Sequence, residues 1–399
     1  MGNVRKALGA VAAAAAVIAA AGTAYASGTG GDWTQGDHDA SGNRANTTAT
    51  QISAANAGTV APLRALAAPA LPPDGPGCGE GFTTPVIVAK RVYTVSSGRL
   101  MAVDLTTGAT VWSRVLDVGG ATANTVTAVD RGQVYVGQRD CTSQSDPAGA
   151  ILAFTATTGA PLWQQPVGAL SSVAVSGTRV LGSSTSVGNG TTVKVLDSAT
   201  GAVVWERDLP GFCPVSARIV AAQVYYSECD PDTDALVDLA AARLSDGVVV
   251  WRKAGDVRIE RGDALGSAST HLFTASTAID PATGATRYTA PGVTRVDAVG
   301  TNRVFGACGP VVCAFDKATG ARVWTSTVAA GTGAASARAA LAATLLYLPT
   351  GEVLNSATGA LVTTLWTGEA RALSVGDGYV LAIPSESRRL LDVYGLPGS

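Results

Sequence analysis

Acidic residues are concentrated near the middle of the chain, in the segment Asp-Pro-Asp-Thr-Asp that begins at Asp230. Asp230, Asp232 and Asp234 place carboxylates at alternate positions, as the first ligands of a calcium-binding loop do. The pattern is incomplete, because Ala235 stands where such a loop has its turn glycine and Ala241 where it has a bidentate glutamate. Metal binding by these three residues is therefore one hypothesis, and a solvated acidic loop is the favoured alternative.

A second candidate site consists of arginines that each stand near the start of a segment expected to form an inner strand. The four residues are Arg258, Arg295, Arg338 and Arg371. A guanidinium presents a planar fork of donors that suits carboxylate, sulfate or phosphate, so the four arginines predict an anion site at the mouth of a central channel. The favoured alternative is that each arginine reaches solvent or pairs with a nearby acid such as Glu260, Asp297 or Glu369.

Six cysteines offer redox chemistry or covalent cross-links, and their even number is compatible with three disulfides in an exported chain. All six fall in the longer loops between expected strands. The expected pairs are Cys78 with Cys141, Cys213 with Cys229, and Cys308 with Cys313. Free buried cysteines are the alternative.

Other reactive groups are scarce. His38 and His271 are the only histidines, too few for a histidine-based zinc site or a repeated acid-base relay. The formal net charge is −2, which does not favour nucleic acid as a partner. We therefore predict no catalytic residues and no assignable cofactor-binding residues.

A repeat positions these candidate groups. Seven times a short apolar run ends in an acidic or polar residue and reaches a glycine three or four positions later. The glycines are Gly108, Gly159, Gly201, Gly247, Gly284, Gly320 and Gly359. Four residues beyond the glycine stand Trp112, Trp163, Trp205, Trp251, Tyr288 and Trp324, whereas the last copy has Thr363. β-rich units with this spacing favour the blades of a propeller.

Each copy of the repeat has a local physical explanation. The carboxylate can accept backbone N–H groups of a tight turn, and the glycine supplies the positive φ that reverses the chain. The acid is present at Asp104, Asp197, Asp280 and Asp316. An aromatic at a constant position in each copy predicts a wedge between neighbouring blades.

The strands around the repeats predict an all-β, eight-bladed propeller of four-stranded antiparallel blades. Seven blades fit between Phe82 and Thr367, and residues 370–395 supply three more strands. The isolated strand at 59–67 can complete this eighth blade, which would close the ring and remove its exposed edges.

Residues 1–26 resemble a secretory signal peptide. Arg5 and Lys6 precede an apolar run, and Ala24-Tyr25-Ala26 provides a cleavage site. The predicted organisation is a signal peptide at 1–26, a lead-in segment at 27–58, a propeller at 59–395 and a tail at 396–399. A single membrane anchor is the alternative for the first segment. We expect the mature chain to lie outside the cytoplasm without a membrane span.

The repeat copies, such as AFDKATGARVW at 314–324, resemble the PQQ-like repeat of eight-bladed quinoprotein-type propellers, and the resemblance covers most of 82–395. It implies a secreted bacterial member of a family that includes PQQ-dependent dehydrogenases and a scaffold subunit of the outer-membrane β-barrel assembly machine. The dehydrogenases carry adjacent cysteines beside the quinone, and this chain has no Cys-Cys pair. The resemblance therefore implies the fold more strongly than the PQQ and Ca²⁺ chemistry.

The favoured function is a secreted, non-catalytic and monomeric scaffold that binds a protein or an envelope polymer through its long loops, without a cofactor. A PQQ- and Ca²⁺-dependent dehydrogenase is the first alternative. A glycan-binding propeller is the second, with Trp33, Phe212 and Trp366 as the aromatic residues outside the repeat positions.

Overall fold

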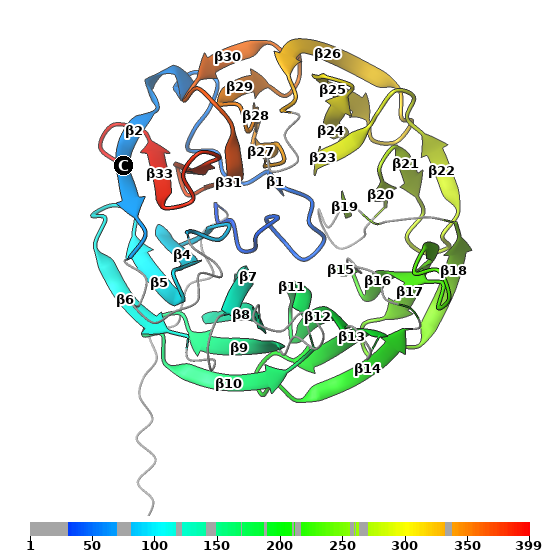
Figure 1. Cartoon of the computed structure of the whole chain (residues 1–399). Helices are drawn as coiled ribbons and strands as arrows, with labels where there is room; N and C mark the ends of the chain where they lie inside the picture. Colours follow the sequence, from blue (N-terminus) through cyan, green and yellow to red (C-terminus); the bar gives the residue numbers. More distant parts are fainter. Residues whose placement is uncertain are drawn as a thin grey trace, which may run out of the picture.

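The computed structural model describes residues 31–69, 81–116, 122–140, 149–168, 170–186, 190–209, 211, 217–255, 259, 261–262, 270–331 and 337–399. Regular structure in this part of the chain is β-strand, apart from the short 3-10 helix η1 (Ala57–Thr59). The strands form eight sheets arranged as the blades of a ring (Figure 1). The predicted all-β, eight-bladed propeller is confirmed.

The first four blades follow the chain in order, each a meander of four antiparallel strands. Blade 1 contains β3 (Val86–Val88), β4 (Arg91–Ser96), β5 (Arg99–Asp104) and β6 (Thr110–Val115). Blade 2 contains β7 (Thr122–Asp130), β8 (Gln133–Asp140), β9 (Gly149–Thr155) and β10 (Pro161–Pro166). Blade 3 contains β11 (Leu170–Ser176), β12 (Arg179–Ser186), β13 (Gly190–Asp197) and β14 (Val203–Leu209). Blade 4 contains β15 (Ala217–Val220), β16 (Gln223–Cys229), β17 (Leu236–Arg243) and β18 (Val249–Ala254).

The next three blades repeat this pattern. Blade 5 contains β19 (Arg261–Gly262), β20 (Leu272–Thr274), β21 (Thr277–Ile279) and β22 (Thr286–Thr289). Blade 6 contains β23 (Arg295–Val299), β24 (Arg303–Cys308), β25 (Val311–Asp316) and β26 (Arg322–Ala329). Blade 7 contains β27 (Ala340–Ala342), β28 (Leu345–Tyr347), β29 (Glu352–Asn355) and β30 (Leu361–Thr364), and β1 (Ala45–Asn46) pairs in parallel with its innermost strand β27.

Blade 8 joins the two ends of the described chain. It contains β31 (Ala370–Gly376), β32 (Tyr379–Pro384) and β33 (Leu390–Gly395), and its outer strand is β2 (Ala61–Ala67) from the N-terminal part. β2 pairs antiparallel with β33, with Ala61 opposite Gly395 and Ala67 opposite Leu390. The predicted ring closure by the strand at 59–67 is confirmed, with the strand beginning two residues later.

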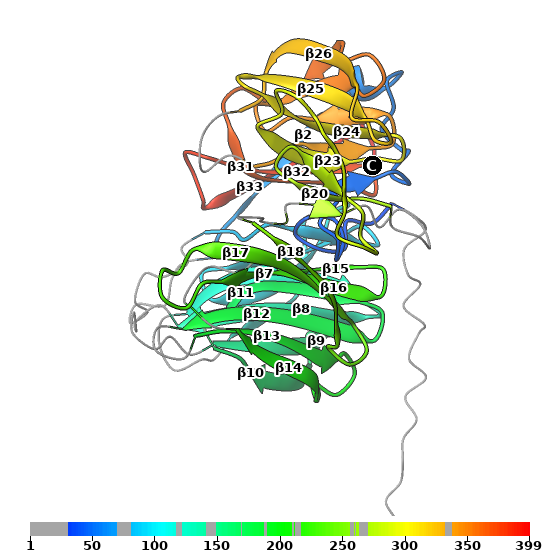
Figure 2. The same cartoon turned by 90° about the vertical axis from the view of Figure 1, so that its right-hand side faces the viewer.

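Successive links of a meander alternate between the two ends of the ring. The repeat turns and the links between the first and second strands lie at one end, which we call the turn face. The links between the second and third strands and those between blades lie at the other end, the loop face. The side view in Figure 2 shows the strands running between these two ends. The described residues contain no helix long and apolar enough to cross a membrane.

The repeat aromatics lie between neighbouring blades, against the repeat glycine of the next blade. Each also donates a hydrogen bond to the carbonyl that follows the acid position in the next copy. The contacts are Trp112 to Ala156 (2.9 Å), Trp163 to Ser198 (3.0 Å), Trp205 to Leu244 (3.0 Å), Trp251 to Pro281 (2.9 Å), Tyr288 to Lys317 (2.7 Å) and Trp324 to Ser356 (3.1 Å). The repeat therefore encodes the junctions between blades as well as their turns.

The junction that closes the ring uses an arginine instead of an aromatic. Arg64 of β2 packs over Gly108 of blade 1, and its Nη2 donates to the Thr106 carbonyl over 3.0 Å. A guanidinium is planar like an indole, so it can lie flat against a glycine backbone. The closing strand thus reproduces the wedge of the six aromatic junctions.

Replacing Gly247 with alanine tests this double role of the repeat glycine. Gly247 has φ +72° and a Cβ there would lie 2.8 Å from the Trp205 ring, so the substitution adds a clash to a strained backbone. We expect a loss of about 2–4 kcal/mol in the free energy of unfolding, measured in urea. Gly98→Ala is the matched control, because Gly98 has φ +69° with nothing within 4 Å. Equal losses in the two variants would show that the wedge contact is unimportant.

Candidate functional site at the centre of the ring

An irregular N-terminal segment lies inside the ring and contacts all eight blades. We call residues 31–46 the collar; it is the blue chain at the centre of Figure 1. Each blade donates at least one backbone N–H to it. One pair from each blade is Asp377 to the Gly31 carbonyl (2.8 Å), Ile87 to Trp33 (2.9 Å), Val129 to Thr34 (2.8 Å), Val175 to Gln35 Oε1 (3.0 Å), Ile219 to Ala40 (3.1 Å), Gly262 to Ser41 (3.0 Å), Val299 to Asn43 (2.8 Å) and Leu341 to Arg44 (2.9 Å). Blades 1 and 7 each donate a second N–H, from Ala89 to Asp32 Oδ1 and from Ala343 to Asn46 (both 3.0 Å).

The collar makes one circuit, from blade 8 through blades 1 to 7, in the order of the chain. Contacts with the turns at Ala89, Ala343 and Asp377 place it toward the turn face. Residues 31–46 belong to the segment 27–58, which the sequence predicts as a lead-in before the propeller. They lie inside the ring and contact its blades.

Short polar side chains shape the collar locally. Asp39 accepts hydrogen bonds from the Ser41 backbone N–H (3.0 Å), the Ser41 hydroxyl (2.6 Å) and Asn43 Nδ2 (2.8 Å). Between them Gly42 has φ +67°, and a Cβ on it would meet the Arg218 guanidinium at 2.9 Å. This turn therefore needs a glycine both for its backbone and for the approach of a charged side chain.

Asp37 of the collar binds three arginines at the centre of the ring. Its Oδ1 lies 3.0 Å from Arg44 Nη1, and its Oδ2 lies 2.9 Å from both Arg218 Nη2 and Arg261 Nη1. Arg218 comes from β15 and Arg261 from β19, so the carboxylate joins the collar to blades 4 and 5. Arg44 also donates to the carbonyls of Ala339, directly before β27 of blade 7, and of Leu373, within β31 of blade 8.

The charges at this centre depend on one another. Burial raises the pKa of Asp37, but Arg261, Arg218 and Arg44 outweigh it and hold the pKa of this carboxyl far below its usual value. Burial lowers the pKa of Arg44 and Arg218, and Asp37 opposes that effect. Asp37 therefore remains ionised at any pH near neutrality and compensates cations that are withdrawn from water.

Asp297 of β23 forms a second ion-pair group beside the first. Arg295 approaches it with Nε and Nη2 at 2.6 and 3.0 Å, and Arg338 Nη1 lies 3.4 Å away. Arg261 Nε donates to the Asp297 carbonyl over 3.2 Å. Two of the four candidate arginines thus pair with an acid, as the alternative interpretation of the sequence stated.

Arg371, the third candidate arginine, makes no described contact with these carboxylates. Arg371 is the second residue of β31, where burial and the nearby Arg388 lower its pKa. Arg258 lies outside the described residues. Anion binding at the four arginines stays a prediction.

The acidic segment at Asp230 forms a turn of the same kind as the repeat turns. Asp230 Oδ1 accepts the backbone N–H groups of Asp232 and Thr233, both at 2.9 Å, and Asp234 takes the positive-φ position of the repeat glycine with φ 56°. The hydrogen bonds from Thr233 lower the pKa of the Asp230 carboxyl. Among the described residues no group of three or more His, Cys, Asp or Glu side chains is placed to hold a metal ion. The incomplete ligand pattern therefore corresponds to a capped hairpin turn.

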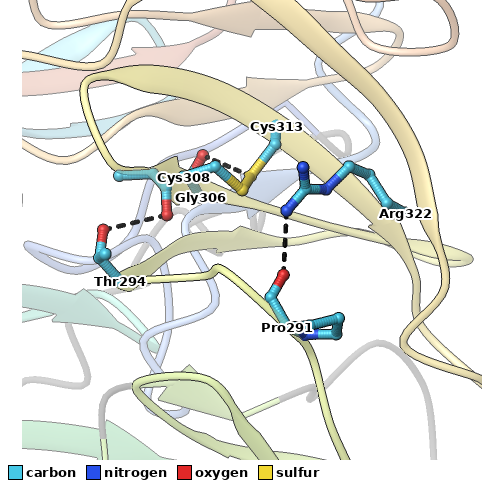
Figure 3. The surroundings of a disulfide bond; sticks show 7 residues. Pro291, Thr294, Gly306, Cys308, Cys313 and Arg322 are labelled. Carbon is cyan, nitrogen blue, oxygen red and sulfur yellow. Dashed lines mark hydrogen bonds between the residues drawn. A yellow bond between two sulfur atoms is a disulfide. The ribbon is translucent and has the colours of Figure 1, made fainter.

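Three of the six cysteines lie in the described part of the chain. Cys308 and Cys313 form a disulfide across the loop-face turn of blade 6, with Cα atoms 5.9 Å apart (Figure 3). Cys229, at the end of β16, is disulfide-bonded. Its predicted partner Cys213, together with Cys78 and Cys141, lies outside the described residues.

An open cleft of about 430 Å³ lies on the turn face between blades 3 and 4. Its charged lining residues are already paired: Arg179 lies 3.5 Å from Asp197, and Arg243 lies 2.9 Å from Asp246. Arg243 stands at the acid position of its repeat copy, and Asp246 supplies the turn carboxylate instead. The variant turn of blade 4 thus forms part of the cleft wall.

The central residues do not fit the calcium part of a PQQ centre. Calcium requires several free oxygen ligands, whereas both oxygens of Asp37 and of Asp297 face guanidinium groups. Asp39 likewise directs its oxygens at Ser41 and Asn43. The contacts of these carboxylates therefore hold the collar and its neighbouring strands.

Sequence reasoning missed Asp37, Arg44, Arg218 and Arg261. A usable signal was the position of Arg218 and Arg261, which occupy the first two positions of their inner strands, as Arg295 and Arg371 do. In blade 5, the distance from the repeat aromatic pointed to Arg258, whereas the inner strand begins at Arg261. The distance misleads because the links between blades differ in length.

Comparison with known families and structures agrees with the repeat and the ring. The family model described as outer membrane protein assembly factor BamB matches residues 52–252 and 147–287, which together span more than half of the chain. A comparison with curated proteins finds no match.

Solved structures with the same fold include two dehydrogenases and a BamB protein. The quinohemoprotein alcohol dehydrogenase from Comamonas testosteroni is 14% identical with a TM-score of 0.66, over 92% of this chain and 81% of that one. BamB from Moraxella catarrhalis is 18% identical with a TM-score of 0.55, over 84% and 99%. A europium-containing methanol dehydrogenase is 15% identical with a TM-score of 0.61, over 88% and 89%. At these identities the similarity establishes the fold alone.

Proposed function

Because the chain belongs to the family described as outer membrane protein assembly factor BamB, we propose that it is a non-catalytic scaffold that acts outside the cytoplasm. It binds a partner protein or an envelope polymer through the loop face, as a monomer. The net charge of −2 makes nucleic acid a poor partner.

The observation that supports this proposal most directly is the disulfide bracing of the loop face. Cys308 and Cys313 cross-link the two ends of a hairpin turn, and Cys229 anchors a second hairpin of the same face. The loop at Cys308 is further tied down by Thr294, whose hydroxyl donates to the Ala307 carbonyl (Figure 3). Loops that are already ordered lose less conformational entropy when a partner binds, so bracing favours a binding surface.

The structure offers less support to the two alternative functions. The central carboxylates are engaged by arginines, which counts against a PQQ- and Ca²⁺-dependent dehydrogenase. For glycan binding, Trp33 is fully buried, and Trp366 packs on Tyr394 with ring centres 5.3 Å apart. Phe212 lies outside the described residues.

Site-specific photo-cross-linking tests the scaffold proposal. A photoreactive phenylalanine analogue is placed at exposed Asp232 on the loop face and, as a matched control, at exposed Ala318 on the turn face. Whole cells of the source organism are irradiated, and adducts are separated on gels. We expect discrete adducts from position 232 and none from position 318. Adducts from position 318 alone, or from neither position, would overturn the loop-face assignment.

A cofactor titration tests the main alternative separately. The purified protein is mixed with PQQ and Ca²⁺, and its visible spectrum and its reduction of a dye with short alcohols are recorded. We expect no perturbed quinone band and no dye reduction. A saturable band with alcohol-dependent turnover would replace the scaffold by a dehydrogenase.

A further inference from the structure

The collar and the closing strand β2 belong to one N-terminal segment whose binding site exists only when the ring is complete. Asn46 Nδ2 donates to the Val375 carbonyl over 3.1 Å, and Arg44 Nη2 donates to Leu373 over 2.8 Å. Gly31 and β2 likewise contact blade 8. These contacts join residues more than three hundred positions apart, so the segment that is synthesised first finds its full site last.

The blades that the collar contacts are sheets formed mainly by their own strands. Each blade forms its own ladder of backbone hydrogen bonds, whereas the collar takes only one or two backbone N–H groups from each blade. Between these points the collar has little regular structure of its own, with β1 covering only two residues. Its stability therefore depends on the simultaneous presence of all eight blades.

We propose that the collar is a strap that docks last, as one cooperative unit, into the ring formed by the eight blades, and locks them together. Every blade is attached to a single continuous chain, so separating any two blades requires the strap to detach from at least one of them. Asp37 is the strongest point of attachment, because it ties the strap to arginines of two adjacent blades.

This proposal predicts a specific pattern of native-state hydrogen exchange. In the full-length chain, Asn46→Ala removes three hydrogen bonds that Nδ2 donates, to Gly31, Asp32 and Val375. We expect the eight amides named above, one from each blade, to exchange together, roughly tenfold faster or more. Amides inside the β12–β13 and β24–β25 ladders should keep the parent rates.

Asn355→Ala is the matched control, because Asn355 caps the turn at Ala357 and Thr358 outside the collar. It should leave the eight amides unchanged. If Asn46→Ala does not fold, Gln35→Ala is measured instead, which removes two hydrogen bonds to Val175.

Three results would overturn the proposal. Acceleration spread equally over the ladders would mean that the collar unfolds only with the whole ring. Acceleration confined to the amides next to residue 46 would mean that the collar is not a cooperative unit. Failure of both variants to fold would mean that the blades cannot close without it.

Discussion

Deletion of Ala61–Ala67 should lower the free energy of unfolding by about 6 kcal/mol, since six residue pairs join β2 to β33 and each backbone hydrogen bond contributes about 1 kcal/mol. It also removes Arg64 from the closing junction and exposes the edge of β33. Domains of this kind are stable by only about 5–15 kcal/mol, so much of the protein should be unfolded or aggregated at 37 °C.

The measurement is thermal unfolding followed by circular dichroism, with deletion of residues 27–30 as the control for shortening the N-terminal part. The control should melt close to the parent temperature, because it spares the collar and β2. If both deletions melted at the same temperature, β2 would not be needed to complete the eighth blade.

Replacement of Asp37 with asparagine should cost about 3–5 kcal/mol of stability, because it leaves the buried Arg44 and Arg261 and the half-buried Arg218 without their shared anion. Urea unfolding at pH 7 measures the loss. Asp280→Asn is the matched control: it also breaks an aspartate–arginine pair, but one at the surface, and should cost less than about 1 kcal/mol. A loss below 1 kcal/mol for Asp37→Asn would show that the arginines find other partners.

The same variant gives a pH test with a definite sign. The folded-state pKa of Asp37 is depressed, so the ionised carboxylate contributes fully to the free energy of unfolding above the unfolded-state pKa, which is about 4. This contribution is lost as the pH falls below that value toward the folded-state pKa. The stability difference between parent and variant should therefore be constant from pH 8 to 5 and should narrow below pH 4. Urea midpoints across this range measure it, and a constant difference down to pH 2.5 would contradict the depressed pKa.

The ring could be predicted from the sequence because its determinants are local and repeated. A turn such as Asp316 to Gly320 needs an acceptor and a positive φ within five residues, and both requirements can be read along the chain. The wedge at Trp324 recurs at a constant distance from that turn. The pairing of the strand at 59–67 was predictable for a related reason. The last blade lacked its fourth strand, and the strand at 59–67 was the one predicted strand without a blade.

The centre of the ring could not be read in the same way. His38, Gly42 and Arg44 all have positive φ, so the collar follows neither of the periodicities that reveal strands and helices. Its partners are spread over eight blades, and Arg218 and Arg261 differ in their distance from the preceding repeat aromatic. Their convergence on Asp37 depends on how links of different length bring the inner strands to one axis.

The sequence by itself determined the blade count, the turn chemistry, the aromatic junctions and the source of the closing strand, because each depends on residues that are close in the chain or repeated at a regular spacing. Tertiary structure alone decided that residues 31–46 enter the ring, that Asp37 joins three arginines, and that Arg295 and Arg338 share Asp297. Those contacts link single residues up to several hundred positions apart, and their energy depends on burial and mutual charge, which exist only after the ring has closed.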